Sequence, residues 1–550
     1  MKRKKLIAAL LAAVMVLGLA ACGSSSSDSS DSDDTEEAEE TEEAEESSSE
    51  TSSQLIIGAE SDVVTLDPGR CYETYANMLM RAMYDTLYEM PTDSDEPQEL
   101  LATSITWSDD GLTATITIRD DVVFASGNPL TADDVVFSIM RCKYLQDNPS
   151  FICDGIDSVE AIDDYTVQFN LNTPDSAFTS KLCYSALSII DSELAMEYGA
   201  TCDEDAATTD TAEDYFNSGA SLGSGPYVMS SWTQDEEFVL VANENYYDGD
   251  VAFDEIIIKE MDDANTQMMS LSQGDIQIAM GLNADTVEEL EDTDGVVVTS
   301  YSTMTMAFLY MNMDEEIGGP VSNTLVQQAI RLALDYDGLQ TIVGDGAVTP
   351  TSYIPLGMFS AIEARTSTYT NIDAALELME EAGYADGFEI DFPVCTLSPE
   401  GIPLTDLAQK VASDLSEIGI TLNIITEDWN GGDADEYRNG ELAISLMYWA
   451  PDYIDPNAQL EFLPGGIVGL RAGWTEEMDE ELAAYKDLIV SELDQDAREA
   501  LLVEMQEATS EYTPIIPLVQ YPKYIGAAEG LVGTEFSDSY RIDLRAVAYE

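Results

Sequence analysis

The composition of residues 23–53 excludes this segment from the folded part of the chain. This segment is built almost entirely from serine, aspartate, glutamate, threonine and alanine, with scarcely a large apolar side chain. It cannot bury enough apolar surface to offset the entropy of ordering its backbone. Repulsion among its acidic side chains also favours extended conformations. We therefore predict that residues 22–53 form a disordered acidic tether and that the folded region starts at residue 54.

The first 21 residues have the pattern of an export signal. Four basic residues at positions 2–5 precede a mostly apolar stretch at 6–20, which is shorter than the about 20 residues that span a bilayer as a helix. Residues 19–22 read Leu-Ala-Ala-Cys and resemble the lipobox of bacterial lipoproteins, in which the cysteine is lipidated after cleavage. We expect a signal peptide at residues 1–21 and a lipid on Cys22. The protein would then be anchored on the outer face of the cell membrane, or in the periplasm if an outer membrane exists.

Strong acidity excludes several partners. The chain has 21 Lys and Arg residues against 108 Asp and Glu residues, a formal net charge of −87. Such a field disfavours contact with nucleic acids and with anionic lipid surfaces. We therefore expect no nucleic-acid partner, and a membrane link made by the lipid alone.

The chain contains no histidine. This excludes Ser-His-Asp and Cys-His catalysis, HExxH zinc sites and histidine-ligated haem. The sequence also has no GxSxG motif, no P-loop, no GxGxxG motif and no EF-hand loop. We predict that the protein is not an enzyme and has no metal site and no cofactor.

Six cysteines follow Cys22, and none of them has CxxC spacing. An even number permits disulfides in an exported protein, and buried free thiols are the alternative. The six are Cys71, Cys142, Cys153, Cys183, Cys202 and Cys395.

The pattern of apolar residues predicts an α/β protein. Residues 54–58 and the alternating run at 112–118 are typical of strands. Thr131, with Asp134 three residues later, forms a capping-box signal for a helix over 132–145. After residue 300 the spacing predicts helices at 323–339, 371–384 and 403–419 and strands at 420–429 and 436–449.

Nine blocks occur in order along the chain. They are TLDPGR at 65–70, residues 101–141, GSGPYVMSSW at 223–232, residues 243–261, LSQGDIQIAM at 271–280, VQQAIRLALDYDGL at 326–339, ALELMEEAGYADGF at 375–388, YWAPDYIDP at 448–456 and TPIIPL at 513–518. Each block resembles the corresponding segment of the extracellular solute-binding proteins of the peptide and nickel class (family 5), which serve ATP-binding-cassette (ABC) importers.

The resemblance implies a two-lobed, periplasmic-binding-protein-like α/β fold (class II, cluster C) with an extra subdomain inserted in the first lobe. We place the first lobe at residues 54–85, 218–300 and 511–550 and the inserted subdomain at 86–217. The second lobe then covers residues 301–510. Ligand would be enclosed between the lobes.

The resemblance also implies a role for Asp452. In peptide-binding members, an aspartate three residues after the tryptophan of the YWAPDYIDP block pairs with the α-ammonium group of the ligand, and Trp449 and Asp452 keep this spacing. A fixed carboxylate can replace the lost hydration of an enclosed ammonium group. The structural alternative for Asp452 is a turn acid after Pro451. Asp455, which precedes a proline, is predicted to shape the loop.

Other residues complete the predicted ligand-binding wall. Trp449 and Tyr453 are either wall residues or core aromatics. The resemblance implies contacts from a second loop, for which we select Tyr72, Glu73 and Thr74. Gly223 and its neighbours Gly225 and Pro226 are expected to form a turn or hinge rather than to touch ligand.

The implied function is that of a substrate-binding lipoprotein, a monomer that hands peptides to an ABC permease and its ATPases. Dipeptide-selective members can hold the ligand carboxylate with an arginine of the second lobe, and residues 395–404 contain none. Oligopeptides therefore fit better than dipeptides. The alternatives are another ligand (a nickel chelate, a sugar, haem or an amino-acid derivative), or a peptide-sensing signalling receptor without transport.

Overall fold

The computed structural model describes residues 53–550, except residues 62, 93, 220, 291–292, 366–368, 430–432 and 512. The predicted signal peptide, Cys22 and the tether as far as residue 52 lie outside the described residues. In the described ranges, no helix combines the length and the apolar character needed to cross a bilayer.

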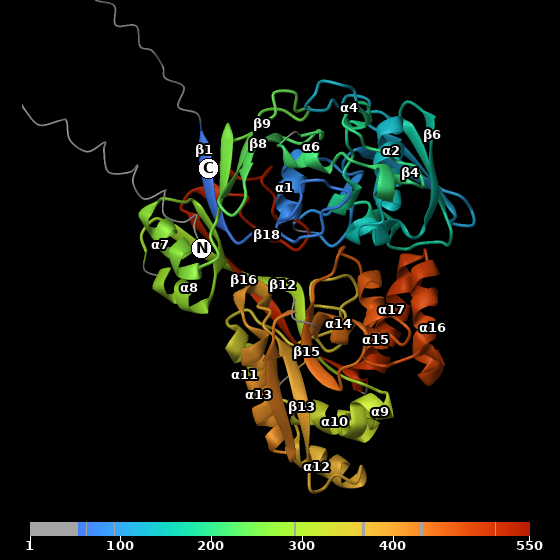
Figure 1. Cartoon of the computed structure of the whole chain (residues 1–550), viewed down its shortest axis with the longest axis vertical. Helices are drawn as coiled ribbons and strands as arrows, with labels where there is room; N and C mark the ends of the chain where they lie inside the picture. Colours follow the sequence, from blue (N-terminus) through green and yellow to red (C-terminus); the bar gives the residue numbers. More distant parts are fainter. Residues whose placement is uncertain are drawn as a thin grey trace, which may run out of the picture. The chain divides into compact units, whose positions relative to one another are not determined.

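One mixed sheet forms the centre of the described region and contains ten of its strands (Figure 1). The strand order is β14-β13-β15-β12-β16-β11-β1-β10-β9-β8. In that order the bounds are Ile420–Glu427, Phe388–Cys395, Ile444–Trp449, Val296–Met311, Ile515–Ala528, Ile278–Leu282, Gln54–Ala59, Glu255–Glu260, Glu237–Ala242 and Tyr227–Thr233. We call the region packed around β1 and β8–β11 the first lobe, and the region packed around β13–β15 the second lobe.

The strands β12 and β16 connect the two lobes. They pair antiparallel from Val296 opposite Ala528 to Tyr310 opposite Ile515. One end of this pair lies beside β11 and the other beside β15, so both strands run through both lobes (Figure 1). Their register shifts between Ser302 and Met306.

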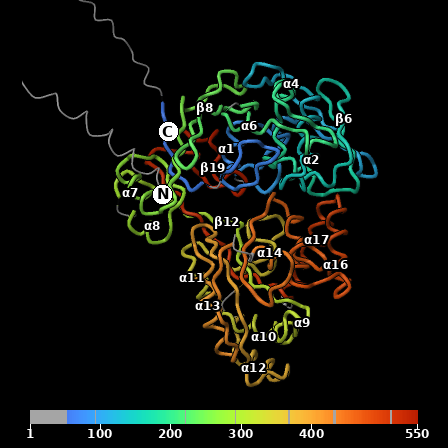
Figure 2. The backbone as a smooth tube through the Cα atoms, viewed as in Figure 1, coloured from blue at the N-terminus to red at the C-terminus, as the bar shows by residue number. Residues whose placement is uncertain are grey.

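The first lobe combines the beginning and the end of the chain. Leu55 and Ile57 of β1 share a buried core with Ile542 and Leu544 from the last residues of the chain. Figure 2 shows the C-terminal segment with β19 near α1. Outside the main sheet this lobe contains α1 (Ala76–Met83), α7 (Ala264–Gln273), α8 (Ala284–Leu290), β17 (Leu531–Val532), β18 (Phe536–Ser537), β19 (Arg541–Ile542) and β20 (Ala548–Tyr549).

A second, four-stranded sheet has its own core, in which Ile116, Val135 and Phe169 are fully buried. Its order is β4-β5-β7-β6, and we call it the side sheet. Its strands are Ala102–Trp107, Thr113–Ile118, Thr166–Leu171 and Ile156–Asp163, and α2 (Ala132–Leu145) packs on it. The smaller elements of this part are β2 (Tyr88–Glu89), β3 (Gln98–Glu99), η1 (Asn148–Cys153), α3 (Phe178–Lys181), η2 (Ser185–Leu187) and α5 (Ala206–Thr209). The helices α4 (Ser192–Glu197) and α6 (Glu213–Asn217) contribute Ala195 and Phe216 to the core of the first lobe.

Helices on both sides of β13–β15 complete the second lobe. The predicted apolar face of α13 (Leu404–Ser416) is confirmed, because Leu404, Leu407, Val411 and Leu415 are fully buried. The other elements are α9 (Glu315–Gly318), η3 (Gly319–Ser322), α10 (Thr324–Ala333), α11 (Tyr336–Val343), α12 (Ile372–Glu381), η5 (Pro399–Gly401), α14 (Asp433–Arg438), η7 (Pro456–Phe462), α15 (Ile467–Arg471), η8 (Glu476–Met478), α16 (Glu480–Ser491) and α17 (Gln495–Glu511).

Two predictions about secondary structure were wrong in extent. The run 323–339 is interrupted at Leu334, which is extended, and Asp335 then caps a new helix by accepting from the Gly338 N–H. The run 436–449 begins in α14 and becomes a strand at Ile444. Gly440, with φ of +69°, follows the end of α14, so the strand pattern applies only to residues after this turn.

Of the six cysteines in the described region, Cys142, Cys153, Cys183 and Cys202 are free thiols. Five of the six are buried and Cys202 is half-buried. For these four cysteines, the structure has the free thiols that the sequence leaves open as the alternative to disulfides.

Candidate ligand-binding cavity

A cavity of about 1060 Å³ lies where the first lobe, the second lobe and the side sheet meet. It is at the upper end of the roughly 300–1,000 Å³ typical of small-molecule sites. Its wall takes residues from the loop before α1, the segment 148–185, the loop after β13, residues 429–471 and the C-terminal segment 538–541. The space is therefore large enough for a ligand with several polar groups.

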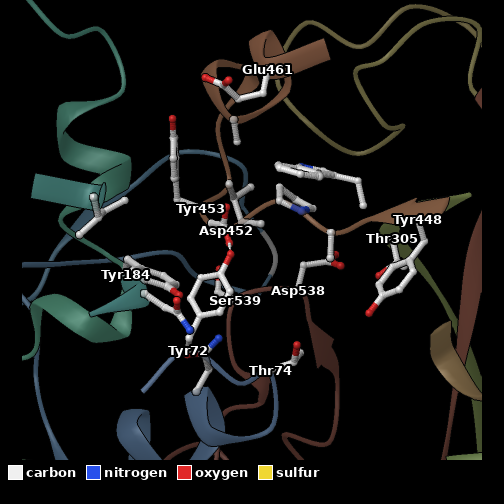
Figure 3. Close-up of a pocket in the computed structure, with 18 of the residues that line it drawn as sticks. Tyr72, Thr74, Tyr184, Thr305, Tyr448, Asp452, Tyr453, Glu461, Asp538 and Ser539 are labelled. Atoms are coloured by element: carbon white, nitrogen blue, oxygen red, sulfur yellow. Dashed lines mark hydrogen bonds between the residues drawn. The ribbon is translucent and has the colours of Figure 1, made fainter. Parts of the chain in front are cut away.

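Asp452 faces this cavity from the loop that follows β15 (Figure 3). The Tyr72 hydroxyl, from the loop before α1, donates a hydrogen bond of 2.8 Å to Asp452 Oδ1. Burial raises the pKa of Asp452 to about 6, although the hydrogen bond from Tyr72 opposes this shift. Burial and the neighbouring Asp452 also raise the pKa of Tyr72.

Asp452 forms no ion pair with any of the described residues. Within the described residues, no Lys or Arg nitrogen lies within 4.0 Å of its carboxylate. A buried carboxylate without a cation is costly to ionise. A positively charged ligand group placed beside Asp452 would remove that cost, so the geometry suits recognition of an ammonium group.

Trp449 and Tyr453 contribute to both the cavity wall and the core. The Trp449 ring packs edge-on against Phe462 with centroids 5.7 Å apart, and it also lines the cavity. Tyr453 packs against the core of the side sheet, and the Lys181 ammonium lies 5.5 Å from its ring centroid. Both aromatic residues therefore line the cavity and also pack against a core.

Two of the three binding residues predicted in the loop before α1 line the cavity. Tyr72 and Thr74 line the cavity, whereas Glu73 is not part of the described lining. The Glu73 carboxylate folds back and accepts from the Tyr72 N–H at 3.1 Å and from the Cys71 thiol at 3.6 Å. The structure thus brings five of the six predicted binding residues to one cavity and leaves Glu73 in the loop scaffold.

Asp455 shapes the loop, as predicted, and also forms a buried ion pair. Its Oδ1 accepts from the Asn457 N–H at 2.8 Å at the start of η7. Its Oδ2 accepts from the Arg498 guanidinium at 3.1 Å, and both side chains are buried. Sequence reasoning missed Arg498 because it lies in α17, far along the chain.

The glycines at 223 and 225 serve as scaffold. A Cβ atom on Gly223 would lie 2.1 Å from the Met83 carbonyl oxygen, and one on Gly225 would lie 2.6 Å from the Ala82 oxygen. These positions need glycine because the backbone passes the end of α1 too closely for a side chain. They are not part of the described cavity lining.

A buried ion cluster at the cavity was not predicted. The Glu400 carboxylate of the second lobe accepts two hydrogen bonds from Arg541 of the first lobe, at 3.0 and 2.8 Å. The Lys523 ammonium of β16 lies 3.1 Å from Glu400, and the Thr305 hydroxyl donates to it at 3.2 Å. Burial alone would raise the pKa of Glu400, but the charges of Arg541 and Lys523 hold it well below its usual range.

The backbone at this cluster is unusual. Glu400 and Arg541 both have left-handed φ angles, of 48° and 63°. Such angles are uncommon for residues other than glycine. In the sequence, Glu400 is one acid among many, and nothing near it indicates a partner 141 residues away.

Asp538 is a second acid of the wall. It lies between β18 and β19, and its Oδ1 accepts from the Met304 N–H at 2.8 Å. Burial raises its pKa to about 7, to which the Glu400 charge adds while Arg541 opposes it. Sequence reasoning gave no signal for this residue.

Two arginines that the sequence places near the motif stack on aromatic rings. The Arg471 guanidinium lies 4.7 Å from the Tyr437 ring centroid, and the Arg438 guanidinium lies 5.1 Å from the Trp429 centroid. Arg438 lies 3.8 Å from the exposed Asp435. Over the described ranges, no group of three or more metal-ligating side chains is close enough together to hold a metal ion.

Comparison with known proteins identifies relatives of this architecture. The family model "Bacterial extracellular solute-binding proteins, family 5 Middle" matches residues 96–466. The "Probable D,D-dipeptide-binding periplasmic protein DdpA" of Escherichia coli is 26% identical over 407 residues, which are 73% of this chain and 75% of that protein. "Heme-binding protein A" of Haemophilus influenzae is 26% identical over 472 residues, 81% of this chain and 83% of that protein.

The fold also matches solved structures. The Helicobacter pylori periplasmic binding protein DppA, solved in complex with the peptide STSA, has a TM-score of 0.72 at 23% identity. The match covers 90% of this chain and 98% of that one. This likeness confirms the predicted two-lobed α/β fold.

Proposed function

Because the chain belongs to the bacterial extracellular solute-binding proteins of family 5, we propose that it captures peptides between its two lobes and delivers them to a separate ABC permease and its ATPases. Members of this family are transport binding proteins rather than enzymes. The prediction that the chain is not an enzyme is therefore confirmed.

The observation that carries this proposal is the Asp452 carboxylate, which faces the cavity with a hydroxyl donor and, among the described residues, without a cation. The α-ammonium group of a peptide placed there would complete a charge-assisted pair in a dry site. Removing one partner of a buried pair of this kind typically costs about 2 to 5 kcal/mol. Asp452 would thus fix the amino end of the ligand.

We expect the lobes to close on the ligand, because both lobes contribute residues to the cavity wall. Tyr72 and Thr74 come from the first lobe, whereas Trp449 and Asp452 come from the second. A ligand touched from both sides favours the closed state, because only that state makes both sets of contacts. We also propose the lobe and subdomain boundaries that were predicted from the sequence.

We propose oligopeptides as better ligands than dipeptides. The cavity volume of about 1060 Å³ supports this, since a dipeptide would leave much of it to water. The wall arginine nearest the loop after β13 is Arg541, and its guanidinium is already bound by Glu400. No arginine of that loop is available for the carboxylate of a short ligand.

Haem is the second candidate ligand, because one relative is named as a heme-binding protein. The chain has no histidine that could bind haem iron. A nickel chelate, a sugar, an amino-acid derivative and a signalling role without transport complete the alternatives.

The attachment to the membrane is also a proposal. We propose that a lipid on Cys22 anchors a monomer to the outer face of the cell membrane and that the acidic tether gives it reach. The Leu-Ala-Ala-Cys pattern at residues 19–22 supports this.

Native mass spectrometry of the purified protein tests the ligand class. We expect co-purifying peptides, which the Asp452→Asn variant loses or binds at least about tenfold more weakly. The matched control is Asp164→Asn, because Asp164 is an exposed acid outside the described cavity lining. Recovery of haem or a sugar instead of peptide would overturn the proposal, and unchanged peptide affinity in Asp452→Asn would overturn the role of that residue.

A further inference from the structure

Several charges of the cavity wall are matched inside the protein. Glu400 is bound by Arg541 and Lys523, as described above. Glu461 pairs with Lys486 at 2.8 Å, and the Lys181 ammonium pairs with Asp175 at 2.6 Å. These groups have no free charge to offer a ligand.

Asp452 and Asp538 differ from these matched groups. For both carboxylates, the part of the chain that the structure describes supplies hydrogen-bond donors but no Lys or Arg nitrogen within 4.0 Å. The donors are the neutral Tyr72 hydroxyl and the neutral Met304 N–H. Glu60 and the exposed Asp154 also line the cavity without an ion pair among the described residues. Since the proposed function assigns Asp452 to the ligand's α-ammonium group, Asp538 remains as a second strongly desolvated anionic group in the same cavity.

The position of Asp538 is fixed by the fold. The Met304 N–H that holds it belongs to β12, which connects the lobes, and β18 and β19 flank it in the sequence. Figure 3 draws Asp452 and Asp538 at separate places on the wall. One extended ligand could therefore reach both with different groups.

The charged residues near Asp538 do not neutralise its carboxylate. Arg541 is close enough to lower the pKa of Asp538, but its guanidinium is engaged by the two Glu400 oxygens. The Glu400 charge acts in the opposite direction and raises the pKa of Asp538. A cationic group beside Asp538 would compensate both its burial and the repulsion from Glu400.

We infer that Asp538 is a specificity-determining residue of this cavity, whose carboxylate receives a second cationic group of the ligand. The cavity would then select peptides that carry a lysine or arginine side chain in addition to their α-ammonium group. This inference rests on the proposed function, because it assumes that the ligand is a peptide held at Asp452.

Tripeptides with alanine at all positions but one test the inference. The variable position, second or third, carries lysine, norleucine or Nε-acetyllysine, so that chain length is matched while charge changes. Isothermal titration calorimetry with the full chain gives the ratio of dissociation constants for norleucine and lysine peptides. This ratio isolates the side-chain charge, because both peptides have the same α-ammonium group.

We expect the lysine peptide to bind at least about tenfold more tightly than the norleucine and acetyllysine peptides at one of the two positions. In Asp538→Asn, which keeps an oxygen to accept from Met304, the ratio should fall to within about threefold. In Asp164→Asn the ratio should stay at the wild-type value, because that variant removes the same charge from an exposed position that is not part of the described cavity lining. The overall net charge of −87 attracts any cation, and its effect is common to both variants.

Two outcomes would overturn the inference in distinguishable ways. If all the peptides bind wild type with similar affinity, or if Asp538→Asn keeps the lysine preference, Asp538 does not select the ligand and the proposed function stands. If wild type binds none of the peptides, the proposed function fails and the inference fails with it. The melting temperature of Asp538→Asn shows whether the variant is folded, and Asp538→Glu, which restores the charge, should recover part of the preference.

Discussion

The Tyr72 hydroxyl donates to Asp452 Oδ1 at 2.8 Å, although the two residues are 380 positions apart and belong to different lobes. This contact holds the proposed ligand anchor in place from the opposite side of the cavity. It also supplies a neutral donor to a carboxylate whose burial disfavours charge. Tyr72 therefore orients Asp452 without neutralising it.

Removal of this donor should change the titration of Asp452. In Tyr72→Phe the pKa of Asp452 should rise above about 6, because the hydrogen bond that lowers it is lost. We expect peptide affinity to fall several-fold at pH 6.5 and much less at pH 8, where the carboxylate is ionised in both proteins. Calorimetry at the two pH values measures the effect, and Tyr549→Phe, at an exposed tyrosine, is the control. Equal losses at both pH values would contradict the electrostatic explanation.

The affinity of the wild-type protein should depend on pH through the same carboxylate. The pKa of Asp452 is about 6 in the empty cavity, and a bound ammonium group would lower it. The charged form, which binds, is complete above about pH 7 and is lost as the pH falls through 6. Affinity for a peptide with uncharged side chains should therefore be highest near pH 7 and decrease below pH 6, approaching about tenfold per pH unit. It should also decrease at and above about pH 8, where the α-ammonium group of the ligand loses its proton. Asp452→Asn should abolish the decrease below pH 6, and a flat profile over that range in wild type would exclude Asp452 as the anchor.

The ion cluster at Glu400 should contribute to stability. Glu400→Gln leaves the buried charges of Arg541 and Lys523 without their carboxylate. Loss of one partner of a buried ion pair typically destabilises a protein by about 3 to 5 kcal/mol, and we expect a decrease of this order in the free energy of unfolding. Urea unfolding followed by circular dichroism measures it. Asp121→Asn removes the partner of Arg119 at an exposed pair and should have little effect. Similar midpoints for the two variants would contradict a stabilising role for the cluster.

Thiol reactivity should follow burial. Five of the six cysteines in the described region are buried, and burial also raises the pKa of Cys183 and of the half-buried Cys202. In the full chain carrying Cys22→Ser, an aromatic disulfide reagent at pH 8 should label Cys202 slowly and Cys142, Cys153 and Cys183 only after unfolding. Mass spectrometry of the labelled peptides identifies the site. Rapid labelling of Cys142 or Cys153 in the folded protein would contradict the structure.

The bounds of a helix could be predicted from the sequence where capping residues at its ends mark them. The helix expected at 132–145 has these bounds in the structure because Thr131 and Asp134 form the predicted capping box. The run 323–339 has the spacing of one helix, but Asp335 caps a second helix inside it, and tertiary contacts of Leu334 decide the break. Periodicity cannot distinguish one interrupted helix from one continuous helix.

The sequence predicted mainly those cavity residues that lie in or beside the YWAPDYIDP block. Trp449, Asp452 and Tyr453 were found because they lie together in one loop at the end of a strand. Glu73 was chosen by its place in a loop, yet a single residue of shift decides which side chain points into a cavity. Glu400, Asp538 and Arg541 come together only in the folded chain, so their pairing depends on topology rather than on spacing.

The pair of strands β12 and β16 has a mechanical consequence. Two antiparallel strands with many inter-strand hydrogen bonds resist stretching and sliding, but they bend and twist most easily where the pairing is interrupted. The register of this pair shifts between Ser302 and Met306 and again between Ala307 and Phe308. The Gln520 side chain bridges the first shift by donating to the Thr303 carbonyl oxygen at 2.5 Å. Elastic compliance between the lobes is thus concentrated in a few residues of the two strands. A change at Gln520 would alter the rate at which the lobes exchange between states, while the residues that contact ligand stay the same.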